Sequence, residues 1–191
     1  MARTGDTFTP LSDGVITLRE FVDDDATWLA EASADPEIPR FTMVPIGITA
    51  AEYLDWIQRG REITDPGRGR RLLIADAKTG APLGSAGIGE VRPEVQTAEV
   101  FYWVAAPARR RGVATRTVRL LAQWSFTVLG LARLELFTQV DNVASQAVAT
   151  SAGFVREGIL RSLRPVHGVR TDLVLFSQLP TDTPATATRT R

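Results

Sequence analysis

The stretch that decides the fold is ARRRGVATRTVRLLAQWSF, residues 108–126. Three consecutive arginines stand directly before Gly112, and apolar residues then recur at helical spacing. This pattern predicts a tight turn that opens into a helix over residues 113–129. The first N–H groups of a helix have no partner within it and carry partial positive charge, so we expect the turn to bind an anion.

The composition of the turn indicates which anion it would bind. Gly112 lets the backbone come close to a ligand, Ala114 keeps the first helical turn small, and the arginines add charge-assisted hydrogen bonds. We therefore expect a pyrophosphate held without a metal. The stretch has neither the GxxxxGK[ST] motif of a P-loop nor a three-glycine dinucleotide fingerprint, and a solvated surface turn remains the alternative. The residues expected at the anion are Arg109, Arg110, Arg111, Gly112, Val113, Ala114 and Thr115.

The length and composition are those of one globular domain. The chain has 191 residues, of which 44% are apolar and 23% charged. We expect the domain to span residues 11–179, between a loosely ordered N-terminus at 1–10 and a flexible tail at 180–191. The N-terminus lacks an apolar signal segment, and no run approaches about 18 apolar residues, so the cytoplasm is the expected location, without membrane contact.

The charges and rare residues exclude several classes of function. Lys and Arg together number 22, as do Asp and Glu, so no overall field would attract nucleic acid. There is no cysteine, which rules out disulfides, thiolate metal sites and a cysteine nucleophile. The one histidine, His167, precedes Gly168 and is expected to be a turn residue. No metal is expected.

The periodicity of the remaining chain predicts an α+β fold. Its elements follow the order strand, two helices, three strands, helix, strand, helix and two strands. The three central strands form an antiparallel meander, whereas the helical crossovers are expected to return parallel, which gives a mixed sheet. The expected strands are 14–21, 70–77, 83–91, 97–105, 131–140, 154–163 and 169–179, and the expected helices 21–33, 49–60, 113–129 and 141–153.

The helix at 141–153 carries a second group of candidate residues. Either Asp141 or Asn142 can cap it, and Val143, Ala147 and Val148 repeat at helical spacing. Ser145 falls in the first turn, where a polar residue more often reflects a preference for helix starts than catalysis.

Two motifs resemble one known family. Residues 109–114 match the [QR]-x-x-G-x-[GA] signature of the GNAT superfamily of N-acetyltransferases, and they follow a strand and open a helix as that family requires. The region 142–158 is similar to the N-x-x-S…GF…EG segment of RimJ/RimL-like enzymes, through Asn142, Ser145, Gly153, Phe154, Glu157 and Gly158. The likeness covers residues 11–179 and implies a layered α/β/α GNAT fold with about seven strands and four helices.

The resemblance also implies a function and residue roles. It implies transfer of an acetyl group from acetyl-coenzyme A to a primary amine of a protein N-terminus or a small molecule. The pyrophosphate would bind at the arginine turn, Asn142 would bind pantetheine or the helix end, and Ser145 would donate a proton to the leaving thiolate. Glu99 would act as a base through water, with a salt-bridged glutamate as the alternative. The backbone positions expected to pair with pantetheine are Trp103, Val104 and Ala105.

One departure from the branch pattern bears on the acceptor. The penultimate strand offers Arg161, Arg164 and His167 where a further acid is common, which puts a ribosomal-protein substrate in doubt and indicates a carboxylate on the acceptor or on a group near it. The alternatives left open are a non-catalytic acyl-coenzyme A binding module and transfer of another acyl group such as succinyl. A homodimer through the last strands is a further expectation.

Overall fold

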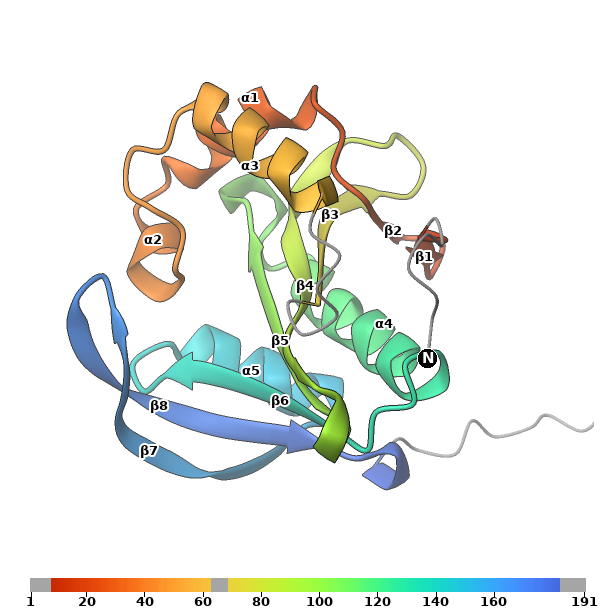
Figure 1. Cartoon of the computed structure of the whole chain (residues 1–191), viewed down its shortest axis with the longest axis vertical. Coiled ribbons are helices and arrows are strands. Elements are labelled where there is room, and N and C mark those ends of the chain that lie inside the picture. Colours follow the sequence, from red (N-terminus) through yellow and green to blue (C-terminus); the bar gives the residue numbers. More distant parts are fainter. Residues whose placement is uncertain (1–7, 63–68, 183–191) are drawn as a thin grey trace, which may run out of the picture.

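The structure is a computed structural model that describes residues 8–62 and 69–182. In these residues, one mixed sheet of eight strands is combined with five α-helices (Figure 1). The strands are β1 (Leu11–Ser12), β2 (Ile16–Arg19), β3 (Arg70–Asp76), β4 (Pro82–Arg92), β5 (Thr97–Val104), β6 (Arg133–Gln139), β7 (Val155–Val166) and β8 (Val169–Gln178). The helices are α1 (Asp25–Ser33), α2 (Glu37–Phe41), α3 (Ala50–Glu62), α4 (Val113–Thr127) and α5 (Val143–Ala152).

The α+β prediction is confirmed. The strand order is β1-β2-β3-β4-β5-β6-β8-β7, and every neighbouring pair is antiparallel except β5 and β6, which are parallel. The expectation that helical crossovers return parallel holds for β5, α4 and β6. It is wrong for the connection from β2 to β3, because these strands pair directly in antiparallel register although three helices lie between them in the chain.

Two apolar cores lie on opposite faces of the sheet. The larger core packs α4 and α5 against the sheet, with Val118, Leu121 and Ala149 fully buried. The smaller core packs α1 and α3 against the other face, around Leu29 and Leu73. Figure 1 shows the same layering, with α1 and α3 above the sheet edge and α4 and α5 behind it.

Two helices differ from the sequence predictions. The proline-containing connection at 35–47 contains the short helix α2, which is too short to show an apolar period. In α5, Val143 and Ala147 are exposed, whereas Ala149 and Ala152 form the buried face. A helix of mostly small residues gives a weak apolar pattern, so its packed face could not be read from the sequence.

The predicted terminal segments are described only in part. Residues 1–7 and 183–191 lie outside the described residues, so the predictions for both ends stay predictions. Phe8 packs edge-on against the Trp124 ring of α4, with 5.6 Å between ring centroids. Across the described ranges, no helix combines the length and hydropathy that a membrane span requires.

The parallel pair β5 and β6 separates after three residues. The paired positions are Thr97 with Arg133, Ala98 with Leu134, and Glu99 with Glu135. Beyond Glu99, the described residues of β5 pair only with β4, on their other side. One edge of β5 is therefore open over residues 100–104, at the end from which α4 begins.

Candidate active site

The turn before α4 has a backbone suited to binding an anion. Gly112 caps the helix with a left-handed φ of 75°, and Arg110 also has a left-handed φ, of 58°. Such a conformation costs a residue with a side chain roughly 1–2 kcal/mol and is typical of functional sites. The first helical hydrogen bond runs from Arg116 N–H to the Gly112 carbonyl, at 3.1 Å. The N–H groups of residues 113–115 precede it and have no acceptor within the helix.

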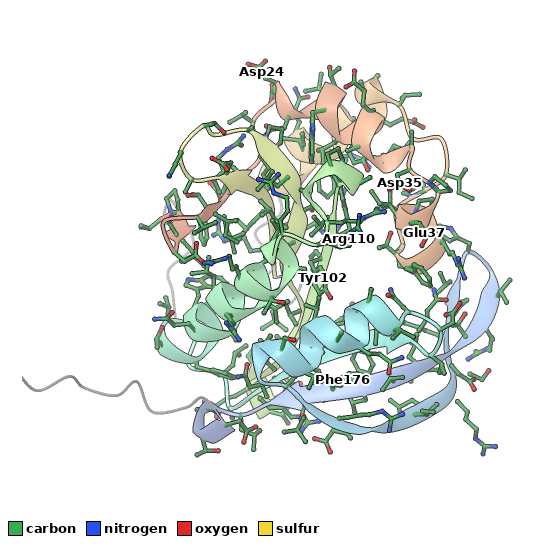
Figure 2. All side chains as sticks on the ribbon, turned by 180° about the vertical axis from the view of Figure 1, so that it is seen from behind. Asp24, Asp35, Glu37, Tyr102, Arg110 and Phe176 are labelled. Atoms are coloured by element: carbon green, nitrogen blue, oxygen red, sulfur yellow. The ribbon has the colours of Figure 1, made fainter. Side chains whose placement is uncertain are left out.

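The three arginines of this turn differ in their surroundings. The Arg109 guanidinium lies 2.6 Å from the Asp35 carboxylate, and its Nε donates to the Val104 carbonyl at 3.0 Å. Arg109 therefore fixes the turn to the end of α1 and to β5. Arg110 and Arg111 are exposed. Figure 2 labels Arg110 in the turn that leads into α4.

The backbone of β5 distinguishes between the three residues expected to pair with pantetheine. The Ala105 N–H donates to the Leu83 carbonyl at 2.9 Å, so it faces β4. Successive residues of a strand direct their N–H and C=O groups to alternate sides. Trp103 therefore also faces β4 and Val104 faces the open edge, as its bond from Arg109 shows. Of the three positions expected to pair with pantetheine, only Val104 directs its backbone groups toward the open edge.

Ser145 is held from two sides at the start of α5. Asn142 caps the helix, and its Oδ1 accepts a hydrogen bond from the Ser145 N–H at 3.0 Å. The Ser145 hydroxyl lies 3.0 Å from the hydroxyl of Tyr102 on β5. Of the two predicted caps, the structure thus selects Asn142, and it shows that the candidate proton donor has a phenol as its neighbour.

Tyr102 is a partly buried phenol between α4 and α5 (Figure 2). Its ring packs against the larger core. Burial raises the pKa of the phenol to about 12, although the hydrogen bond with Ser145 acts in the opposite direction. The group therefore keeps its proton at every physiological pH.

Glu99 lies on the opposite face of β5 and is ion-paired. Its two carboxylate oxygens accept hydrogen bonds from Arg164 of β7, at 2.6 and 2.9 Å. The Glu99 side chain is only 13% exposed. The bond to Glu99 raises the pKa of Arg164, and the guanidinium lies over the Phe137 ring at 5.2 Å. The structure thus shows the salt-bridged glutamate that the sequence analysis gave as the alternative. The role of Glu99 as a base stays a prediction.

Most of the predicted residues line one continuous cleft that crosses the open edge of β5. It brings together Glu99, Trp103, Val104, Arg109, Arg110, Gly112, Val113, Ala114, Thr115, Asn142 and Ser145. Ala105 and Arg111 do not line it. Thr138 of β6 also lines the cleft, and its buried hydroxyl has no hydrogen-bond partner among the described residues. An unsatisfied hydroxyl beside an unpaired strand edge is suited to a ligand that carries amides.

A contact between distant segments borders the cleft. The turn between β7 and β8 approaches α2, and Figure 1 shows the two side by side. Nε2 of His167 lies 2.8 Å from the Pro39 carbonyl oxygen and 3.0 Å from that of Thr42. The φ of His167, 46°, confirms that it is a turn residue. The described residues contain no cluster of three or more His, Cys, Asp or Glu side chains that could bind a metal.

Sequence reasoning missed two residues of this site. For Tyr102, an aromatic residue within FYWV gives no sign that its hydroxyl contacts a helix 43 positions later. Arg164 was noted only as a departure from a family pattern, and its partner Glu99 is 65 positions away. In both cases the position within the strand indicates the face but not the partner.

Comparisons with known proteins agree with this geometry. A family model described as an acetyltransferase (GNAT) domain matches residues 16–155. The chain is 27% identical over 164 residues to the uncharacterized N-acetyltransferase p20 of Bacillus licheniformis, covering 86% of this chain and 92% of that protein.

Two solved structures bound to forms of coenzyme A are similar. Mycobacterium smegmatis RimJ in complex with CoA-disulfide aligns with a TM-score of 0.82 and 25% identity, over 94% of this chain and 90% of that one. Spermidine N-acetyltransferase from Vibrio cholerae, in complex with CoA and spermine, aligns with a TM-score of 0.75 and 20% identity, over 89% and 98% of the two chains. The second likeness concerns the fold alone.

Proposed function

Since the chain belongs to the acetyltransferase (GNAT) family, we propose that it transfers an acetyl group from acetyl-coenzyme A to a primary amine. The acceptor is the N-terminus of a protein or a small-molecule amine, and transfer is direct, with both substrates bound together. Similar proteins carry names of both acceptor classes: a ribosomal-protein-serine acetyltransferase of Escherichia coli and the spermidine N-acetyltransferase of Vibrio cholerae.

The observation that carries the proposal is the backbone of residues 110–115. Two left-handed residues, Arg110 and Gly112, turn the chain so that the free N–H groups of a helix start lie together beside the open edge of β5. Consecutive N–H groups in such a turn form a concave anion site, and the helix dipole adds positive potential. A pyrophosphate followed by an amide-bearing arm fits this arrangement, with Val104 N–H and the Thr138 hydroxyl as partners for the arm.

The proposed reaction requires few groups from the protein. The amine nitrogen attacks the thioester carbonyl carbon, a C–N bond forms and the C–S bond breaks. Ser145 gives its hydroxyl proton to the departing sulfur and recovers one from solvent, and the proton lost by the amine passes through water to Glu99 or to solvent. Alignment of the reactants and stabilisation of the carbonyl oxygen by an N–H near Val104 supply most of the rate enhancement.

The pair formed by Glu99 and Arg164 defines the acceptor side. Because Glu99 already accepts two hydrogen bonds from the Arg164 guanidinium, any proton that it takes from the amine competes with this pairing. An α-amino group, whose pKa is near 8, needs little help to lose its proton, whereas lysine, whose pKa is about 10.4, needs more. We therefore favour an α-amino group as the acceptor over a lysine side chain.

Two measurements test the proposed function. Isothermal titration calorimetry with coenzyme A is expected to give a saturable heat. Release of free thiol from acetyl-coenzyme A is expected to require an amine, in a panel of amino acids, peptides with free N-termini and polyamines. Binding of coenzyme A without release of thiol for any amine would instead support a non-catalytic acyl-coenzyme A binding module. Faster release of thiol from succinyl-coenzyme A than from acetyl-coenzyme A would show that the transferred group is succinyl. Absence of heat at near-millimolar coenzyme would refute both readings.

A further inference from the structure

The hydroxyls of Tyr102 and Ser145 meet across the point where the sheet opens. Tyr102 lies on β5, three residues beyond the last pair with β6, and Ser145 lies in the first turn of α5. Their oxygens are 3.0 Å apart. Both residues line the cleft. This bond links β5, beyond its last pair with β6, to the first turn of α5.

We propose that Tyr102 is a positioning residue for Ser145: its phenol donates to the serine oxygen and thereby directs the single serine proton toward the sulfur of the acyl donor. The inference rests on the proposed function, since it assumes that Ser145 faces the departing thiol.

The direction of this hydrogen bond follows from the chemistry of the two groups. A serine hydroxyl has one proton and two lone pairs, and a phenol is the more acidic of the two and hence the better donor. If Tyr102 donates, the serine proton remains available for sulfur. If serine donated to the phenol instead, its only proton would point away from the cleft. Because Asn142 already fixes the Ser145 backbone, the phenol is what sets the remaining rotation of the hydroxyl.

In the proposed arrangement Tyr102 does not itself supply the proton, because its hydroxyl is engaged with the Ser145 oxygen rather than with the sulfur. With a pKa of about 12, the phenol also remains un-ionised at neutral pH. The phenol therefore acts while protonated and stays protonated. Its role differs from that of a core aromatic, because the ring fills the larger core whereas the hydroxyl contacts the serine.

A double-mutant cycle tests the coupling. Ser145→Ala is expected to lower kcat by about 100-fold and Tyr102→Phe by about tenfold, each with a change of less than about threefold in KM for acetyl-coenzyme A. The double variant should be no slower than Ser145→Ala, because Tyr102 acts only through the serine. The matched control is Tyr53→Phe, which removes the hydroxyl of the other tyrosine, buried in the smaller core on the opposite face of the sheet.

A second readout needs no turnover. Protein labelled with 3-fluorotyrosine gives one fluorine signal for each of its two tyrosines, and the two Tyr→Phe variants assign them. Ser145→Ala and the addition of coenzyme A should each shift the Tyr102 signal while leaving the Tyr53 signal in place.

The possible outcomes separate the two proposals. An active wild-type chain with an equally active Tyr102→Phe variant, or with additive effects in the cycle, overturns the role of Tyr102 alone. A Tyr102 signal that responds neither to Ser145→Ala nor to coenzyme A does the same. A wild-type chain that binds coenzyme A but releases no thiol with any amine overturns the proposed function together with the inference. Loss of activity in Tyr53→Phe as large as in Tyr102→Phe would show a general structural effect and also overturn it.

Discussion

Arg164 donates two hydrogen bonds to the Glu99 carboxylate and thereby joins β7 to β5 across the intervening strands β6 and β8. The pair places a negative and a positive charge side by side in the cleft. It also determines what each group can do, since neither is available to a substrate without competing with the other.

We expect Glu99→Gln to lower kcat by about 10- to 100-fold, because the neutral amide no longer attracts the amine or accepts its proton. The matched control is Glu135→Gln on β6. Glu135 lies directly opposite Glu99 in the sheet, is 15% exposed and is ion-paired with Arg92 and Arg133, but it does not line the cleft. Steady-state kinetics of thiol release measure both variants. Equal activity of Glu99→Gln and wild type would leave Glu99 only its structural pairing with Arg164.

Gly112→Ala should weaken binding of coenzyme A by about tenfold or more. The φ of 75° disfavours any side chain by roughly 1 kcal/mol, and a shift of this turn moves the N–H groups of the anion site. A Cβ at Gly112 would meet nothing within 4 Å, so the effect is not a clash. Gly14→Ala is the control, since its φ is 81° and its surroundings are equally open. Calorimetry should show weaker binding only for Gly112→Ala, while thermal unfolding shows a similar loss of stability for both.

The arginines of the turn should separate into two classes. Arg109→Ala removes an ion pair with Asp35 and a hydrogen bond to Val104, so it should cost about 1–2 kcal/mol and lower Tm by several degrees. Arg110→Ala and Arg111→Ala remove exposed charges, so they should leave Tm unchanged and reduce affinity for coenzyme A by about three- to tenfold. Thermal unfolding and calorimetry on the same three variants test this separation into a stabilising arginine and two ligand-binding arginines. An Arg109→Ala variant that unfolds at the wild-type temperature would contradict it.

Alkaline pH should reveal the burial of Tyr102. Its pKa is about 12 in the folded protein against about 10 in the unfolded chain, so between these values only the unfolded state loses the proton. The contribution to stability is complete below pH 10 and disappears as pH rises toward 12, a loss of roughly 2–3 kcal/mol. Urea unfolding gives the free energy of unfolding at pH 9 and at pH 11. Its decrease between the two pH values should be about 1 kcal/mol smaller in Tyr102→Phe than in wild type. Identical declines would contradict a desolvated phenol.

The sequence predicted those features that depend on local chemistry. A glycine behind charged residues and before an apolar period predicts both a turn and a helix start, and Gly112 and α4 are found as expected. The cap of α5 was narrowed to Asp141 or Asn142 on the same grounds, and the structure selects Asn142.

What the sequence could not provide is the partner of a residue across the fold. Which of three adjacent arginines turns inward depends on the left-handed backbone at Arg110, which no propensity predicts for arginine. The ion pair of Glu99 with Arg164 and the contact of Tyr102 with Ser145 depend on how strands and helices far apart in the chain are placed. The alternation of residues along a strand predicts which face of the sheet a side chain occupies, but its contact partner is known only from the three-dimensional structure.

The separation of β5 from β6 leaves the backbone hydrogen bonding along one edge of β5 incomplete. A ligand that bonds to Val104 would complete it and stabilise the native state by mass action, by about 2.7 kcal/mol at a hundredfold excess over Kd. Melting temperature then becomes an assay for acyl donors before any acceptor has been found, and candidate thioesters can be ranked by the degrees they add.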